Sequence, residues 1–310
     1  MYFRHSCGHG VPLPAASSQI IWGQDARRPR SPRQAPGNAA SAGASAPVFT
    51  LIFTAMHRLL IVLLPLALLI AGFARVARPA APVARPVPVV VVELFTSEGC
   101  SSCPAADAAL RELVAAQAVP GVEVIALGQH VDYWNRLGWK DAYSAPAFTA
   151  RQRWYAAGFG TGSYTPQAVV NGRYELVGSQ RTALATAVAQ AAQAPQATVA
   201  LARAPNGTLT VQVSHLPPGT QAADVTLALA ENGLASQVGR GENAGRLLRH
   251  AAVVRALRPL GHIGPDGTFA ATVPLSLQAD WKPENLRAVV LVQETGSHYV
   301  VGAGSLALGQ

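Results

Sequence analysis

A chain of 310 residues, 50% of them hydrophobic, is long enough for two domains with packed cores and excludes a wholly disordered protein. The net charge of +8 lies entirely within residues 1–88, so the remaining chain is net neutral. Because nucleic-acid binding needs a basic surface, we expect no DNA or RNA partner for the globular part.

Residues 1–88 contain the signals that bear on location. Met56 is followed by a short basic start, an apolar run over 59–73 and a small-residue end. This layout, at about residues 56–74, predicts a cleaved secretory signal, because the apolar run is short for a membrane-spanning helix. We therefore expect a periplasmic or secreted protein. The alternative is an inner-membrane anchor formed by residues 59–74, the only membrane contact that we expect.

The sequence before this signal, residues 1–55, is rich in Gly, Pro, Ser, Ala and Arg and has no helical or strand period. It predicts a disordered leader, or a stretch upstream of the true start at Met56. Residues 75–88 form a Pro/Ala linker, which we expect to be stiff and extended. Cys7 belongs to the leader, so two cysteines remain, and in an exported protein such a pair forms a disulfide or a redox centre.

The first predicted domain, residues 89–195, begins with an unbroken β-branched run at 88–95. Such a run is typical of a strand buried on both faces of a parallel sheet. After a short turn, the pair Cys100-Ser-Ser-Cys103 opens a helix that runs to Val114 and has a proline in its first turn. The cysteine pair is therefore predicted to lie at a strand-to-helix junction.

A second buried strand follows at 122–127, and Ser144 is the expected N-cap of a second helix. Asn171-Gly172 predicts a two-residue hairpin turn between two short strands. Ser179 is expected to cap a last, Ala-rich helix. The predicted order of elements is β-α-β-α-β-β-α.

This order, with Cys-x-x-Cys at the first strand-to-helix junction and a proline opening the hairpin, resembles the thioredoxin fold. The resemblance implies that the Thr165–Pro166 peptide bond is cis and faces the cysteine pair. It also implies that Pro166 presents backbone groups to an extended substrate. The long stretch between Cys103 and Thr165 implies an insertion around residues 130–160.

A finer resemblance rests on the stretches VVELFTSEGCSSCPAAD, HVDYWNRLGWKD, FTARQRWY, YTPQAVVNG and, at 239–255, GRGENAGRLLRHAAVVR. They look like the run of motifs in a secreted bacterial family numbered 1223 among domains of unknown function. The match covers most of residues 89–310, and it implies a thioredoxin-like fold with redox chemistry.

The cysteine pair carries the main functional hypothesis, an exported thiol–disulfide oxidoreductase. Because a helix N-terminus stabilises a thiolate, Cys100 is the expected exposed nucleophile and Cys103 the residue that resolves the mixed disulfide. The partner is then a protein or small-molecule thiol or disulfide, with no cofactor. Two alternatives stay open: a non-catalytic envelope binding module with a structural disulfide, and a copper- or zinc-handling protein that uses the pair and His130.

Two acidic residues precede the pair. Glu93 lies within the first strand, and the buried acid of the corresponding strand in thioredoxins implies that it shuttles the proton of Cys103. Its offset from Cys100 differs by one position, and side chains alternate along a strand, so a solvent-facing or Arg-paired carboxylate is the alternative. Glu98 is expected to be a solvated loop charge.

The substrate-binding candidates come from the inserted region and the hairpin. Tyr133 and Trp134 are the best candidates for an aromatic lid over the cysteine pair, and Thr165 is expected to contact substrate beside Pro166. His130 follows the second strand at its carboxyl end, where ligands of α/β proteins collect. The structural alternatives are a hydrogen-bonded histidine and the ordinary core of an insertion, and we expect no resident metal.

From residue 196 to residue 310 the pattern changes to alternating strands with regularly spaced turn signals. This pattern predicts a small antiparallel β-sandwich as a second domain, without any cysteine. Arg246, Arg249 and His250 are its candidates to face the first domain. The predicted fold class is an α/β thioredoxin-like domain, a mixed sheet with flanking helices, followed by this β-sandwich.

Overall fold

The computed structural model of the protein describes residues 87–116 and 119–309. The predicted leader, export signal and all but the end of the Pro/Ala linker lie outside the described residues, as does Cys7. Within the two described ranges, no helix is both long and apolar enough to cross a membrane.

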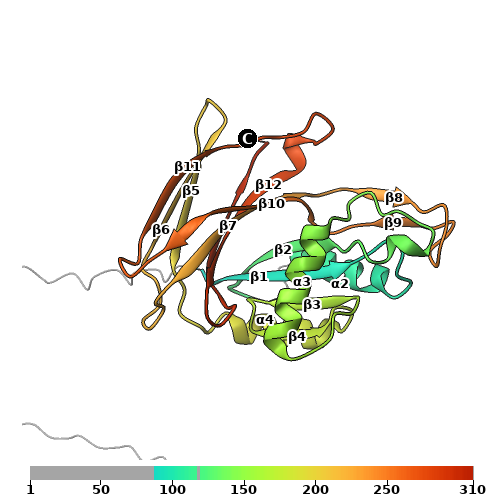
Figure 1. The fold of residues 1–310 in the computed structure, drawn as a ribbon, viewed down its shortest axis with the longest axis horizontal. Helices are drawn as coiled ribbons and strands as arrows, with labels where there is room; N and C mark the ends of the chain where they lie inside the picture. Colours follow the sequence, from blue (N-terminus) through green and yellow to red (C-terminus); the bar gives the residue numbers. More distant parts are fainter. Residues whose placement is uncertain (1–86, 117–118, 310) are drawn as a thin grey trace, which may run out of the picture. The chain divides into compact units, whose positions relative to one another are not determined.

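The first half of the described chain contains the predicted elements in the predicted order, with one added 3-10 turn (Figure 1). They are β1 (Val89–Thr96), α2 (Cys103–Ala116), β2 (Glu123–His130), the 3-10 turn η1 (Asn135–Leu137), α3 (Pro146–Phe159), β3 (Gln167–Val170), β4 (Tyr174–Val177) and α4 (Arg181–Ala191). The cysteine pair therefore lies at the junction of β1 and α2, as predicted.

The two predicted serine caps are wrong. The N-cap of α3 is Ala145, and the Ser144 hydroxyl instead donates to the Asp141 carbonyl at 2.8 Å. The N-cap of α4 is Gln180 rather than Ser179, and it makes no side-chain capping bond. Helix α3 has a proline in its first turn, and since proline has no N–H, fewer donors there need a cap.

Strand β1 is central because it pairs on both edges, parallel with β2 and antiparallel with β3. Its β-branched residues alternate between two buried faces, as predicted for such a run. Val92 and Leu94 pack in the core beneath α2 and α4. Val91 and Phe95 point to the other face, which α3 covers through Phe148 and Tyr155. The face that a residue occupies on β1 thus decides which helix it meets.

The second half of the described chain is built from strands. They are β5 (Thr198–Arg203), β6 (Thr208–Ser214), β7 (Ala223–Glu231), β8 (Ala235–Gln237), β9 (Leu247–Arg249), β10 (Val253–Ile263), β11 (Phe269–Pro274), β12 (Leu286–Glu294) and β13 (Val300–Ala307), with a 3-10 turn η2 (Pro283–Asn285). The segment 247–263 is divided into β9 and β10 around Ala252, whose φ is 39°.

The predicted β-sandwich needs one correction, because most of its strands extend the first sheet. A single eight-stranded sheet has the order β13-β12-β7-β10-β2-β1-β3-β4 (Figure 1). One hydrophobic core accordingly contains Val91 and Ile125 together with Ala228 and Val289. The division expected after residue 195 therefore does not separate two sheets.

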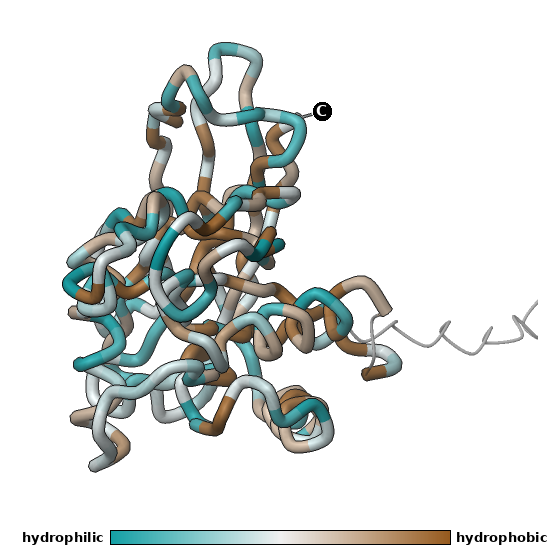
Figure 2. Tube along the Cα trace, turned by 90° about the vertical axis from the view of Figure 1, so that its right-hand side faces the viewer, coloured by the Kyte–Doolittle hydropathy of each residue, from teal (hydrophilic) through white to brown (hydrophobic). Residues whose placement is uncertain are grey.

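Only β5, β6 and β11 form a separate three-stranded sheet, and β8 and β9 form a short hairpin. The three-stranded sheet packs its apolar residues, such as Leu209 and Val211, against Val225 and Val290 of the large sheet. Hydrophobic residues accordingly follow the strands, whereas the connecting loops are mostly hydrophilic (Figure 2). A two-layer packing of antiparallel strands exists, but the large sheet supplies one layer.

The two halves join where β10 begins beside β2. Val253 pairs with Gly128, and Gly128 N–H donates to the Ala252 carbonyl at 2.8 Å. A Cβ added to Gly128 would lie 2.3 Å from the Ala251 carbonyl oxygen, so only glycine permits this approach. An unpaired strand edge is a liability that the fold removes here, because the outer edge of β2 accepts the distant strand.

Candidate functional site

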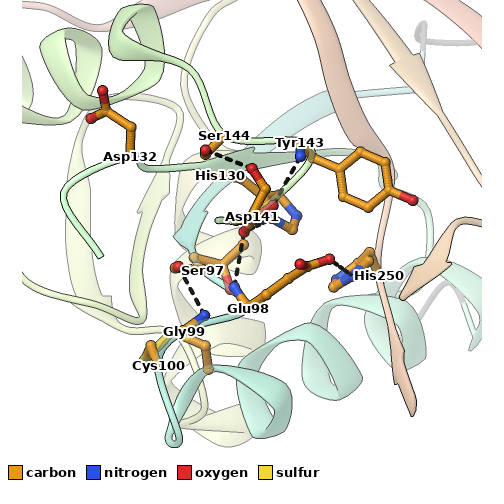
Figure 3. A network of polar contacts seen from close by, with 12 residues as sticks. Ser97, Glu98, Gly99, Cys100, His130, Asp132, Asp141, Tyr143, Ser144 and His250 are labelled. Atoms are coloured by element: carbon orange, nitrogen blue, oxygen red, sulfur yellow. Dashed lines mark hydrogen bonds and ion pairs between the residues drawn. A yellow bond between two sulfur atoms is a disulfide. The ribbon is translucent and has the colours of Figure 1, made fainter. Parts of the chain in front are cut away.

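The cysteine loop, residues 97–102, joins β1 to α2 and is held by its own backbone (Figure 3). The Cys100 N–H donates to the Ser97 carbonyl at 3.2 Å, and the Cys103 N–H donates to the Cys100 carbonyl at 3.2 Å. The Gly99 N–H donates to Ser97 Oγ at 3.1 Å. These bonds bring the two cysteine Cα atoms to 5.4 Å and their sulfurs to disulfide-bonding distance.

Both cysteines are buried, which corrects the expectation of an exposed nucleophile. Cys100 and Cys103 are each 1% exposed, whereas Ser101 and Ser102 between them are exposed. The physical reason lies in tertiary structure that the local motif does not encode. Segments from the inserted region and from the second half of the chain close over the loop.

The covering loop, residues 238–246, lies between β8 and β9 and makes the most distant of these contacts. Asn243 is 0% exposed, and its Nδ2 donates to two carbonyls of the cysteine loop, including that of Cys100, each at 2.9 Å. The Ser101 N–H donates to Glu242 Oε2 at 2.9 Å. In Figure 1 the β8–β9 hairpin extends toward the end of the sheet where α2 begins.

Glu98 is part of the same closure and is not the solvated loop charge that we expected. It is 1% exposed, and its Oε2 accepts a hydrogen bond from Trp139 Nε1 at 2.7 Å. Its Oε1 lies 3.1 Å from His250 Nε2, and its backbone N–H donates to Asp141 Oδ2 at 2.9 Å (Figure 3). One side chain therefore links the cysteine loop to the insertion and to the end of β9. His250, as anticipated, faces the first half of the chain.

His130, a predicted substrate-binding residue, lies in this network but is 1% exposed. Its Nδ1 is 2.7 Å from Asp141 Oδ2 in a buried ion pair (Figure 3). Burial lowers the pKa of His130, but the charge and hydrogen bond of Asp141 outweigh burial and raise it above its ordinary value. Burial raises the pKa of Asp141, but the charge of His130 outweighs it and lowers that pKa overall. The described fold therefore uses His130 as a hydrogen-bonded buried residue.

The structure brings Trp134, a predicted substrate-binding residue, to the cysteine loop and bonds it to Thr165. The Thr165–Pro166 bond is cis, as the resemblance implied. Trp134 Nε1 donates to Thr165 Oγ1 at 2.9 Å, and Trp134 Cβ lies 3.2 Å from the position of a Cβ added to Gly99. Trp134 thus spans the space between the cysteine loop and Thr165, while Pro166 itself is buried.

Tyr133 shares part of its environment with its neighbour. Like Trp134, it is half-buried and packs against the cluster formed by Phe95, Val131, Tyr155 and Val169 on the α3 face of the sheet. Of the two predicted lid residues, only Trp134 adjoins the cysteine loop. The packing of the Tyr133 ring in this cluster agrees with the structural alternative, in which the residue belongs to the ordinary core of the inserted region.

Glu93 is not brought to the cysteine pair, because β1 places it on the α3 face of the sheet. Its Oε2 accepts from Arg151 Nε and from Gln129 Nε2, each at 2.5 Å, and its Oε1 accepts from the Tyr155 hydroxyl at 2.6 Å. Helix α2, which begins at Cys103, covers the opposite face. Side-chain alternation along β1 therefore favours the Arg-paired alternative for Glu93.

Asp107 is a buried carboxyl on the cysteine side that the sequence reasoning missed. It lies four residues after Cys103 in α2, a spacing that puts both side chains on one helix face. Its Oδ2 accepts from Thr96 Oγ1 at 3.0 Å, and its Oδ1 has no hydrogen-bond partner among the described residues. Burial raises the pKa of Asp107, although the charges of His130 and His250 oppose the shift. The sequence signal that could have identified Asp107 is its i, i+4 spacing from Cys103 within CSSCPAAD.

The copper or zinc alternative finds no arranged ligand set in the part of the chain that the structure describes. Over residues 87–116 and 119–309, no group of three or more Cys, His, Asp or Glu side chains is arranged to hold a metal ion. His130 Nδ1 is already bonded to Asp141.

Comparison with known proteins identifies the family. The family described as "Protein of unknown function (DUF1223)" matches residues 91–293, a span that includes both the cysteine loop and the covering loop. The chain belongs to the DUF1223 family. This DUF1223 protein is also 30% identical to a protein from Agrobacterium tumefaciens with an X-ray crystal structure. That alignment covers 71% of this chain and 94% of the other, with a TM-score of 0.58. No curated protein matches the chain.

Proposed function

We propose that this DUF1223 protein is a thioredoxin-like thiol–disulfide exchange protein in which Cys100 is the nucleophile and Cys103 resolves the mixed disulfide. The observation that carries the proposal is the position of the pair at the start of α2, in a loop that Trp134 adjoins at Gly99 while its indole is bonded to Thr165. The order of elements around the pair, β-α-β-α-β-β-α, supports the same resemblance.

The proposed exchange follows from thiolate chemistry at a helix N-terminus. In the reduced protein, the Cys100 thiolate attacks one sulfur of a substrate disulfide, and the other substrate sulfur leaves as a thiolate. The Cys103 thiol loses its proton and attacks the Cys100 sulfur, which releases the second substrate thiolate and forms the Cys100–Cys103 disulfide. The substrate gains two electrons and the cysteine pair loses two. The same steps in reverse oxidise a substrate dithiol.

Asp107 replaces Glu93 in this proposal as the acceptor of the Cys103 proton. It lies one helical turn after Cys103, is buried, and has an oxygen without a hydrogen-bond partner among the described residues. A carboxyl whose pKa is raised by burial is better matched to a thiol proton than an ordinary aspartate. Asp107→Asn should therefore change the pH profile of the resolving step while Asp107→Glu partly restores it.

The covering loop has to move before a large substrate reaches the pair, because Asn243 bonds to the Cys100 carbonyl and both cysteines are 1% exposed. Opening costs the two hydrogen bonds of Asn243 and that of Glu242. These are individually worth about 0.5–1.5 kcal/mol, so a partly open population is accessible to a reactive partner.

A redox titration tests the proposal. The full chain is equilibrated in glutathione and dithiothreitol buffers, and its free thiols are alkylated with a mass tag. We expect one two-electron transition above about −300 mV, where exchange-active pairs lie. We also expect Cys103→Ser to retain a mixed disulfide with glutathione at Cys100, whereas Cys100→Ser retains none at Cys103.

The burial of both cysteines favours a second candidate, an envelope binding module in which the disulfide is structural. A pair that is reduced only below about −300 mV supports this candidate. So does a partner captured equally well by the native chain and by a variant with both cysteines replaced by serine. Loss of capture in that variant supports exchange.

We also propose that the protein is exported to the periplasm or secreted, with an inner-membrane anchor at residues 59–74 as the alternative. The proposal rests on the basic start, apolar run and small-residue end after Met56. Its partners are then thiols or disulfides of envelope proteins or small molecules. Cell fractionation followed by N-terminal sequencing tests it: a new N-terminus near residue 74 in the periplasmic fraction is expected for a cleaved signal, and a membrane-bound chain with an intact apolar run for the anchor.

A further inference from the structure

A cavity of about 430 Å³ lies beside the second half of α2 and does not include the cysteines. Its walls come from α2, β2, the turn after β7 and the segment that joins β9 to β10. This volume is within the range of pockets that hold small molecules. The cavity has a polar part and an apolar part.

The polar part is basic. Arg111, Arg249 and His250 line the cavity, and no Asp or Glu occurs among the described residues that line it. The Arg111 guanidinium donates through Nη1 to the Arg249 carbonyl, which fixes the cation at the cavity wall. A site with fixed cations and no acid in its lining favours an anion.

His250 supplies a second, independent observation. Its side chain is 2% exposed, and its Nε2 is bonded to Glu98 Oε1. Its Nδ1 is buried and has no hydrogen-bond partner within the described part of the chain. A buried polar atom left without a partner is costly, so a ligand that bonds to it gains more than it would at the surface. When Nδ1 carries the hydrogen, it can donate to a carboxylate.

The rest of the lining is apolar. Val114 and Ala115 of α2, Ala126 of β2, Leu234 and the pair Ala251-Ala252 form this part of the wall. A hydrated inorganic anion would leave these side chains without contacts, so a ligand with a hydrocarbon body fits the site better.

We infer that this cavity binds a small apolar monocarboxylate, with Arg111 and His250 holding the carboxylate and the residues around Leu234 enclosing the hydrocarbon part. This ligand is distinct from the thiol or disulfide partner of the proposed exchange, and its binding does not involve the cysteine sulfurs. A negative result for one of the two proposals therefore does not contradict the other.

Isothermal titration of the full chain with octanoate, and with octan-1-ol as the neutral analogue, tests the inference. We expect octanoate to bind with one site per chain and octan-1-ol to bind at least about tenfold more weakly, because the alcohol lacks the charge-assisted bonds. Arg111→Gln should weaken octanoate binding by about tenfold for the same reason. Arg181→Gln, in an exposed ion pair with Glu112, is the matched control and should leave binding unchanged.

Since a change at the buried His250 can impair folding, a cavity-filling variant gives a second measurement. Leu234→Trp should abolish octanoate binding at an unchanged melting temperature, whereas Leu247→Trp, at a position that is 54% exposed and outside the cavity, should not. Absence of octanoate binding to the native chain overturns the inference. Equal affinity for octanoate and octan-1-ol also overturns it.

Discussion

Two buried polar clusters lie on opposite faces of β1, and their carboxyl groups, Glu93 and Asp107, are hydrogen-bonded to different degrees. On the α3 face, both oxygens of Glu93 accept hydrogen bonds, from Arg151, Tyr155 and Gln129. On the α2 face, Asp107 Oδ1, His130 Nε2 and His250 Nδ1 are buried without hydrogen-bond partners among the described residues.

This difference separates a structural role from a chemical one. A carboxylate bonded at every oxygen holds α3 against the sheet and has no capacity left to accept a proton. Groups with unused hydrogen-bonding capacity beside a reactive pair are where protons or ligands are exchanged. The side of the sheet on which a carboxyl lies therefore indicates its role in cysteine chemistry better than its distance in sequence from the cysteines does.

The largest effect is expected from changing Glu93, whose two oxygens are both hydrogen-bonded. Glu93→Gln leaves the Arg151 guanidinium buried without its counter-charge, and the free energy of unfolding should fall by about 3–5 kcal/mol. Urea denaturation measures it, with Glu112→Gln as the control, because the exposed Glu112–Arg181 pair should contribute little. The potential of the cysteine pair should not change. A shifted potential would return Glu93 to the cysteine chemistry.

A smaller loss is expected on the cysteine side. Asp141→Asn leaves one side-chain oxygen where Asp141 uses two, so it loses the acceptor of either the Glu98 or the Tyr143 N–H together with the charge beside His130, and it should cost about 2–3 kcal/mol. Tyr143→Phe, which leaves the hydrogen bond from the residue 143 backbone N–H to Asp141 Oδ1 in place, is the control.

The pH dependence of this loss identifies its origin. The folded pKa of His130 is raised above 6.5, so its contribution is full below that pH and is lost as the pH rises through the raised value. The folded pKa of Asp141 is lowered below 3.8, so its contribution is full above that pH and is lost as the pH falls through the lowered value. The difference between native and variant chains should therefore be largest between pH 3.8 and pH 6.5 and should shrink on either side of that interval. A difference that does not vary with pH contradicts an ion pair.

Opening the covering loop should change the rate at which the disulfide is reduced more than it changes the free energy of unfolding. Asn243→Ala removes two hydrogen bonds to carbonyls of the cysteine loop, so the disulfide should be reduced about tenfold faster by dithiothreitol. Arg240→Ala, on the exposed part of the same loop, is the matched control. Equal rates in the two variants would show that the covering loop does not limit access.

The smallest expected effect is a gain in stability rather than a loss, and it comes from a change at Asp107. Because the folded pKa of Asp107 is raised, the native state loses stability as the pH rises from 3.8 through the folded pKa, and the loss persists above it. Asp107→Asn removes this penalty while keeping an acceptor for Thr96. It should raise the melting temperature at pH 7 by about 2–4 °C for each kcal/mol regained, with little effect at pH 3. A lower melting temperature at pH 7 would mean that Asp107 is stabilising as a charge.

The local elements could be predicted from sequence because their signals are local. The β-branched run of β1, the Cys-x-x-Cys helix start and the Asn171-Gly172 turn each depend on a few neighbouring residues. The prediction that Ser144 caps α3 is wrong for a local reason as well, since the Ser144 hydroxyl bonds to the Asp141 carbonyl rather than to the helix.

The candidate site could be predicted only in part, because its closure depends on residues far apart in the chain. Glu98 meets Asp141 at a separation of 43 residues and His250 at a separation of 152 residues. No hydrophobic period or motif spacing in the sequence indicates such contacts. Nor does any pattern show that β10 joins β2, since a strand with two apolar faces fits either a separate sandwich or an extension of the first sheet.

The origin of the cover in the second half of the chain has a consequence for biogenesis. Asn243 follows Cys100 by 143 residues, so the ribosome makes the cysteine pair long before the loop that closes over it. An oxidant that meets the growing chain finds both thiols accessible, whereas one that meets the finished protein finds them enclosed. Whether the covering loop has already closed when an oxidant arrives therefore decides how accessible the pair is at its first oxidation.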